Sequence, residues 1–192
     1  MLADLMKLLP PPASPAYSNP DWARVENDHG IRLPADYKAY IERFGAGCID
    51  DFLWVIDPFS SSSDLNIYKG DYFRESYAVM KAEFPGDYPR PAYPAQGAFW
   101  PWGFTENGET LVWIVNDEPD SWSVALHSVD QGEEDLIACG CVEFLCKLLR
   151  SEIHSRILPE DFPSGGGSPY RRAFQVVAIC CGAEFVRFCT AS

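Results

Sequence analysis

The sequence predicts a single α+β domain, in which a mostly antiparallel sheet meander is backed by helices. Apolar residues recur at helical spacing before residue 45 and after residue 140, and short apolar runs of strand type lie between those regions. Hydrophobic residues make up 47% of the 192 residues and aromatic residues 14%, a composition that supports one full hydrophobic core.

The helices are expected where apolar spacing coincides with start and stop signals. Tyr37, Tyr40 and Phe44 share one face of a helix, and Gly45 follows it where a left-handed C-cap residue is favoured. The first three expected helices are residues 2–9, a helix from Asn19-Pro20 (with Asn19 as N-cap) to His29-Gly30, and Ala35–Phe44. A fourth is capped within Ser60–Asp64 and runs to about Glu83, with a break permitted at Gly70. A closing helix begins at about Cys141.

The strands are expected in four short apolar runs, Phe52–Ile56, Ala98–Phe104, Thr110–Val115 and Ser121–His127. Asn107-Gly108 lies between the second and third runs, and this pair is a strong hairpin signal because it favours a tight turn. The last three strands should therefore form an antiparallel meander.

The composition divides the chain into three parts. Residues 1–18 are expected to be a loosely attached arm with a proline-rich linker, and residues 19–158 to be the folded domain. Residues 159–192 are expected to hold a flexible Gly/Ser/Pro joint and an apolar tail, in which Phe174–Phe188 would either add an edge strand or pack as an appendage.

The net charge limits the classes of partner. Lys and Arg number 15 against 28 Asp and Glu, which leaves a formal net charge of -13. Such a surface repels phosphate backbones and anionic lipid, so we expect neither a nucleic-acid nor a membrane partner. The charge favours a basic protein partner, although acidity can also serve solubility alone. Seven cysteines without spaced pairs, and a start that lacks a cationic signal region, indicate a reduced, cytoplasmic protein.

The residue types that carry chemistry do not form a recognisable catalytic or metal motif. His29, His127 and His154 have no partner at a spacing typical of a triad. Zinc bound by Cys139, Cys141 and Cys146 would need the adjacent Cys180 and Cys181, whose spacing suits tetrahedral geometry poorly. We therefore expect no catalytic residues, no metal and no cofactor, and no enzyme activity.

Acidic and aromatic residues gather at the expected strand ends. Three interpretations stay open: a solvated surface, a partner interface, or paired carboxylates of a hydrolase. If the fold brings the turns together, they would form an acidic rim with aromatic anchors, suited to a basic protein. The candidate partner-binding residues are Asp50, Asp51, Trp54, Asp57, Glu106, Asp117, Glu118, Asp120 and Trp122.

The order of these features resembles the SUKH superfamily. The resemblance covers roughly Asp21 to Ile153, and no single motif in it is specific. Its first half consists of Trp22, Glu26, the run Gly30-Ile31-Arg32-Leu33-Pro34-Ala35-Asp36-Tyr37-Lys38, then Phe44-Gly45-Ala46-Gly47, Trp54 and Asp57-Pro58. Its second half consists of Trp102 to Gly108, Leu111-Val112-Trp113, Trp122 and Phe144-Leu145.

The resemblance implies a sheet backed by helices and a non-enzymatic binding function. Bacterial members of this kind are mostly immunity proteins that bind and neutralise a polymorphic toxin, often a nuclease, and other members are regulatory or scaffolding interaction modules. The family has no shared catalytic residues that could be carried over to this chain. The matching residues also make the fold, so the resemblance predicts architecture more directly than function.

Overall fold

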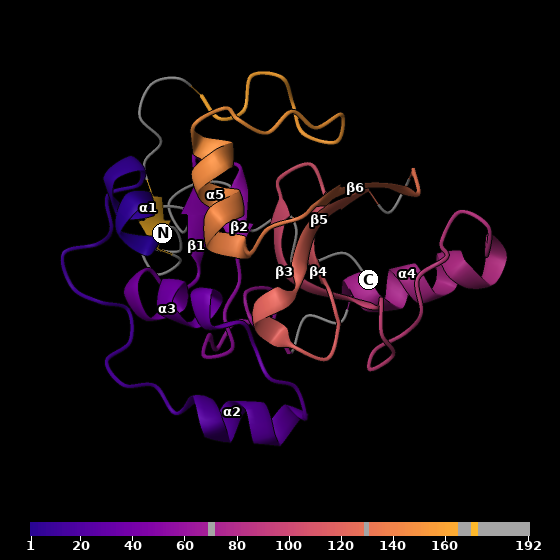
Figure 1. The fold of residues 1–192 in the computed structure, drawn as a ribbon, viewed down its shortest axis with the longest axis horizontal. Coiled ribbons are helices and arrows are strands. Elements are labelled where there is room, and N and C mark those ends of the chain that lie inside the picture. The colour runs from indigo at the N-terminus through magenta and orange to yellow at the C-terminus, as the bar shows by residue number, and fades with distance from the viewer. Residues whose placement is uncertain (69–71, 129–130, 165–169, 173–192) are drawn as a thin grey trace.

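The computed structural model describes residues 1–68, 72–128, 131–164 and 170–172. These residues form a single α+β domain around a seven-stranded antiparallel sheet (Figure 1). The order across the sheet is β6-β5-β4-β3-β2-β1-β7. The strands are β1 (Gly47–Ile49), β2 (Leu53–Val55), β3 (Phe99–Thr105), β4 (Thr110–Ile114), β5 (Ser123–Ser128), β6 (Glu133–Ile137) and β7 (Tyr170–Arg172).

Helices cover the two faces of the sheet unequally. The helices are α1 (Leu2–Leu8), α2 (Trp22–His29), α3 (Ala35–Arg43), α4 (Tyr72–Glu83) and α5 (Cys141–Leu149), with a 3-10 turn, η1, at Pro119–Ser121. Helices α1, α3 and α5 pack on one another, whereas α4 lies well apart from them (Figure 1). Successive side chains of β4 point to opposite faces of the sheet. Leu111 and Trp113 belong to the larger hydrophobic core, with α1, α3 and α5, whereas Val112 belongs to a smaller hydrophobic core, with α4.

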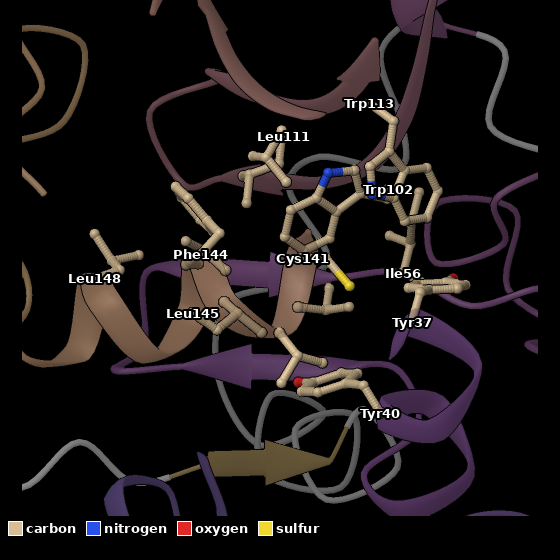
Figure 2. Close-up of a cluster of buried hydrophobic side chains, with 14 of the residues drawn as sticks. Tyr37, Tyr40, Ile56, Trp102, Leu111, Trp113, Cys141, Phe144, Leu145 and Leu148 are labelled. Carbon is tan, nitrogen blue, oxygen red and sulfur yellow. The ribbon is translucent and has the colours of Figure 1, made fainter. Parts of the chain in front are cut away.

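The larger core lies between the sheet and α1, α3 and α5. Trp102 and Trp113 stack with ring centroids 5.7 Å apart, and the ring of Phe144 from α5 meets Trp102 edge-on (Figure 2). Tyr37 from α3 packs on Trp113, and its hydroxyl donates a hydrogen bond to the carbonyl of Ile56 at 2.6 Å. Each large side chain buried here contributes about 1.5–3 kcal/mol through loss of apolar contact with water.

The N-terminal segment differs from the expected loose arm. The short helix predicted for residues 2–9 is present as α1, but Leu5 and Leu9 are fully buried in the larger core. Farther along, the Tyr17 hydroxyl donates to Asp57 at 2.9 Å. The prolines do end the helix, as predicted, yet the apolar face of α1 finds a partner in α5 and attaches the segment to the domain.

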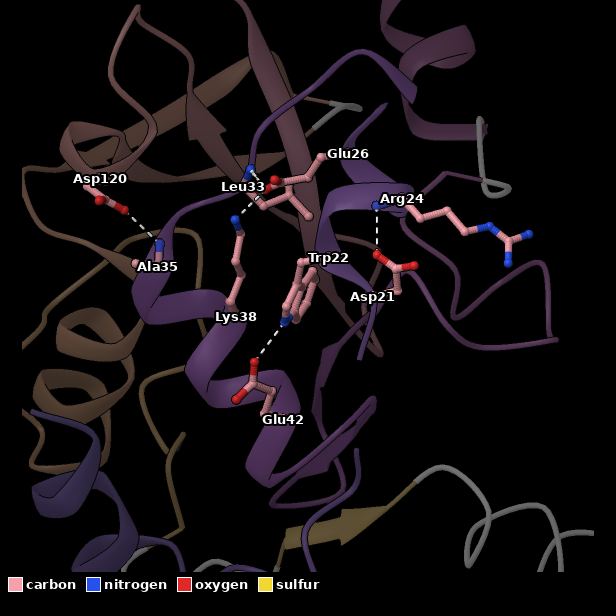
Figure 3. A network of polar contacts seen from close by, with 9 residues as sticks. All are labelled: Asp21, Trp22, Arg24, Glu26, Leu33, Ala35, Lys38, Glu42 and Asp120. Atoms are coloured by element: carbon pink, nitrogen blue, oxygen red, sulfur yellow. Dashed lines mark hydrogen bonds and ion pairs between the residues drawn. The ribbon is translucent and has the colours of Figure 1, made fainter. Parts of the chain in front are cut away.

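The local signals predict most of the central elements. The three-strand meander, the Asn107-Gly108 hairpin and the closing helix from Cys141 are all present, and Gly108 takes a left-handed φ of 96° in the turn. Helix α2 begins later than predicted, because the side chain of Asp21, rather than that of Asn19, accepts a hydrogen bond from the Arg24 N–H (Figure 3).

Three elements differ from the expectations. The helix predicted from Ser60–Asp64 to about Glu83, with a break permitted at Gly70, is present in its second part as α4. Its first part is absent, because residues 57–66 form turns around a bridge between Asp57 and Asn66. Strands β1 and β6 were not predicted, since one is three residues long and the other begins with three acidic residues. Both strands are defined by their pairing, β1 with β2 and β7, and β6 with β5.

The end of the chain is described only in part. Tyr170–Arg172 adds an edge strand to β1, and the Tyr170 hydroxyl donates to the carbonyls of Phe44 and Gly45. Residues 170–172 are thus part of the sheet rather than of a separate joint. Residues 174–188, for which an edge strand or an appendage was expected, lie outside the described residues.

Candidate partner-binding site

The predicted acidic residues fall at two opposite ends of the sheet, so they do not form one rim. The β1–β2 turn and the β3–β4 turn lie at one end, where the Glu106 N–H donates to the Phe52 carbonyl at 3.0 Å. The β4–β5 connection lies at the other end, because each antiparallel strand reverses the direction of the chain. We call these the Glu106 end (Asp50, Asp51, Trp54, Glu106) and the Glu118 end (Asp117, Glu118, Asp120).

The Glu106 end combines an aromatic side chain with carboxylates. The half-buried Trp54 stacks on Phe104 with centroids 6.0 Å apart, and its indole N–H donates to Glu106 at 2.5 Å. Asp51 is exposed and forms an ion pair with Arg171 at 3.2 Å. Asp50 accepts two hydrogen bonds from Ser164, each of 2.6 Å. Glu106 is therefore an exposed carboxylate held beside an indole ring, where both groups can meet a partner.

The Glu118 end has a partly structural role. Asp117 and Glu118 are exposed, but Asp120 accepts a hydrogen bond from the Ala35 N–H at 2.6 Å and so caps α3 (Figure 3). The cap matters because Pro34, at the N-cap position, has no side-chain acceptor. A cavity of about 470 Å³ lies beside this end, between α2 and the β4–β5 connection.

Two of the predicted site residues, Asp57 and Trp122, are almost completely buried. Asp57 is 1% exposed and accepts hydrogen bonds from Tyr17 Oη and from the backbone N–H groups of Ala46, Phe59 and Ser60. Trp122 is 4% exposed, and its indole N–H donates to the Asn116 carbonyl at 2.9 Å. The sequence marks both residues as strand-end groups, but only the fold determines that they point inward.

A groove between α4 and β3 was not predicted. It encloses about 780 Å³ and adjoins the Glu106 end, because Phe104 and the Asn107–Glu109 turn line it. Val79 of α4 also lines it and is 58% exposed. One signal in the sequence could have indicated an exposed apolar surface here, because Val79 does not share the helix face of the residues that were expected to point inward. The residues that line the groove are Ile56, Asp64, Asn66, Phe73, Glu75, Ser76, Val79, Met80, Pro101, Gly103, Phe104, Asn107, Gly108, Glu109, Thr110 and Ser128.

His127 lies under α4 within a ring of aromatic side chains. It is 3% exposed, Nδ1 has no hydrogen-bond partner, and the neighbouring rings are those of Phe73, Tyr77, Tyr88 and Phe99. Burial lowers the pKa of His127 to about 4, against a smaller opposing effect of Glu134. The imidazole is therefore neutral at pH 7, and it packs as an aromatic ring in the smaller hydrophobic core under α4.

The described cysteines are buried thiols. Cys48, Cys139, Cys141 and Cys146 are all free. Burial raises the pKa of Cys139 to about 11 and that of Cys141 well above the ordinary value, so neither thiol forms a reactive thiolate at neutral pH. Within the described residues, no three His, Cys, Asp or Glu side chains are grouped to hold a metal ion. Cys180 and Cys181 lie outside those residues.

Comparison with known proteins identified no relative of this chain. A scan against protein-family models, a search of the curated proteins and a search of the solved structures found no match. In the part of the chain that the structure describes, no helix is both long and apolar enough to cross a membrane.

Proposed function

We propose that this chain is a non-enzymatic immunity protein, which binds a cognate polymorphic toxin in the cytoplasm and neutralises it by covering its functional surface. The observation that carries the proposal is the Glu106 end, where the half-buried indole of Trp54 lies against an exposed carboxylate. Interface hot spots commonly combine an aromatic anchor with charges around it. The resemblance to the SUKH superfamily supplies the toxin as the class of partner.

Charge supports a basic partner at this surface. The chain carries a formal net charge of -13, so its field attracts a positively charged protein and speeds their encounter. A nuclease toxin has a basic surface because it binds phosphate backbones. The proposed inhibition needs only occlusion of that surface, and it uses no catalytic residue of this chain.

The test is co-expression with the toxin encoded by a neighbouring gene. We expect the chain to restore growth of cells that produce the toxin, and to form a stable complex with it. A chain that neither binds the toxin nor protects the cells contradicts the proposal, and an interaction with a non-toxin protein in its place would indicate a regulatory or scaffolding module.

A matched pair of charge reversals tests which end of the sheet meets the toxin. Glu106 and Glu118 are both exposed, and they lie at opposite ends. Glu106→Lys should slow association about tenfold at low salt and flatten its salt dependence, whereas Glu118→Lys should change the rate less. Stopped-flow binding at several salt concentrations measures both, and a larger effect of Glu118→Lys would move the site to the other end.

Trp54 tests the apolar part of the same surface. Trp54→Ala should speed dissociation and cost about 2 kcal/mol of binding free energy, as the loss of an interface anchor does. Trp54→Phe retains a ring against Phe104 but loses the hydrogen bond to Glu106, so it should have the smaller effect. Circular dichroism of both variants separates loss of binding from loss of folding.

A further inference from the structure

The groove between α4 and β3 has an apolar lining that is open to solvent. Val79 is 58% exposed, and Met80 and Phe104 are partly buried. Phe73 and Pro101 add to the apolar lining. The described helices leave this lining uncovered, and a volume of about 780 Å³ is large enough to receive several side chains of a partner.

The charged side chains that line the groove in the described part of the chain are all acidic. Asp64, Glu75 and Glu109 line it, and no Lys or Arg appears among its described lining residues. Asp64 and Glu75 are exposed, and Glu109 accepts a hydrogen bond from Thr105 Oγ1. An apolar centre with carboxylates at its rim is complementary to a segment that carries both apolar and cationic side chains.

We propose that this groove docks a basic, amphipathic segment of a protein partner, with apolar side chains inserted between α4 and β3 and Lys or Arg side chains against Asp64, Glu75 and Glu109. The inference deepens the proposed function and rests on it, because the partner is the proposed toxin. Phe104 lines the groove and also stacks on Trp54, so the groove and the Glu106 end form one continuous surface.

The same chemistry disfavours two other occupants. A second copy of the chain would bring the same carboxylates to the shared interface, where like charges repel. An anionic lipid surface would meet the same repulsion. A basic protein segment is the occupant whose charge the rim attracts.

The first experiment compares two lysine substitutions on α4. Val79 lines the groove, whereas the neighbouring Ala78 is exposed and does not line it. Isothermal titration with the toxin should show that Val79→Lys weakens binding at least about tenfold, and that Ala78→Lys changes it less than about twofold. Both variants add the same charge to the same helix, so equal affinities for the toxin would overturn the inference while leaving the proposed function intact.

The second experiment uses a defined probe and does not depend on the toxin. A 14-residue peptide of alternating Leu and Lys pairs, designed as an amphipathic helix, is titrated into the ¹⁵N-labelled chain, and its Leu/Glu counterpart serves as control. We expect amide shifts that gather at Ser76, Val79, Phe104 and Asn107, that disappear in Val79→Lys, and that the acidic peptide does not produce.

Each remaining outcome of the probe experiment has a fixed meaning. Shifts confined to the groove support the inference even if the toxin is not bound, in which case the proposed function alone fails. Shifts at the Glu118 end, or equal shifts with the acidic peptide, overturn the inference. Dimerisation in sedimentation, or binding to phosphatidylcholine vesicles, that Val79→Lys abolishes would assign the groove to a second copy or to a membrane and would equally overturn it.

Discussion

On one face of the sheet, α1, α3 and α5 pack on the strands and on one another; on the other, α4 leaves a groove beside β3. The first face holds the fully buried rings of Trp102, Trp113 and Phe144. The second holds a smaller core around Phe73 and His127, and beyond it the open groove. The difference indicates that the first face maintains the fold, whereas the second can exchange contact with water for contact with a partner.

The largest expected effect compares one phenylalanine from each face. Phe144→Ala should cost about 4 kcal/mol of unfolding free energy, because its ring is fully buried against Trp102 and its loss leaves a cavity. Phe73→Ala should cost about 2 kcal/mol, because Phe73 is 9% exposed and lines the groove, where water can fill the space. Urea denaturation measures both, and equal losses would mean that the two faces contribute alike.

The second expected effect concerns Asp57, a buried polar residue, and not an aromatic ring. Asp57→Ala should cost about 3 kcal/mol, because it leaves the buried N–H of Ala46 and the hydroxyl of Tyr17 without their acceptor. Asp57→Asn should cost less, since one amide oxygen can still accept. Thermal unfolding checks the order of the two variants, and a loss below about 1 kcal/mol for Asp57→Ala would show that water replaces the carboxylate.

The face under α4 should make stability depend on pH. Because the pKa of His127 is lowered to about 4 in the folded chain, the unfolded chain, with a pKa of about 6.5, binds the proton more tightly between these values. Above about pH 6.5, protonation of His127 therefore does not lower the unfolding free energy. As pH falls from 6.5 toward 4, it lowers the unfolding free energy progressively.

His127→Phe isolates that effect from the titration of the carboxylates. The unfolding free energy of the variant minus that of the parent should rise by about 2 kcal/mol between pH 7 and pH 4.5. Urea denaturation at the two pH values measures the change. A difference that stays constant with pH would show that the imidazole has the same pKa in the folded and the unfolded chain, as an exposed imidazole would.

The smallest expected effect concerns the cap that joins α3 to α5. Asp36 accepts a hydrogen bond from the Val142 N–H at 3.0 Å, and a Cβ at Gly140 would lie 2.6 Å from the same carboxylate oxygen. Gly140→Ala should therefore cost about 1 kcal/mol, which is typical of a lost N-cap. The control is Gly86→Ala, because nothing lies within 4 Å of a Cβ there. Equal stabilities of the two variants would show that the cap tolerates the methyl group.

Local signals in the sequence predicted elements that are stable for local reasons. Helix α3 has its apolar spacing and Gly45, and the β3–β4 hairpin has Asn107-Gly108, so short-range geometry suffices to define them. Strand β6 lacks such a signal. Its Glu133, Glu134 and Asp135 do not alternate with apolar residues, and it is a strand because β5 pairs with it.

For the candidate site, the sequence located these acidic residues in turns but did not determine how the turns assemble. Asp50, Asp51, Glu106, Asp117 and Glu118 do lie in connections between strands. In an antiparallel meander, successive turns lie at alternate ends of the sheet. The separation of the two acidic groups could therefore have been derived from the predicted topology. The groove beside Val79 could not, because it depends on where α4 packs.

The sequence by itself determined the fold class, the central meander, the helices around it and the strongly negative charge, since these follow from composition and from spacing within a few residues. Only the tertiary structure decided that α1 belongs to the core, that Asp57 and Trp122 are buried, and that Asp120 caps α3. Each of these depends on partners distant along the chain. A carboxylate at a strand end has the same local sequence whether it meets water or a backbone N–H, and the packing of distant elements alone determines which it meets.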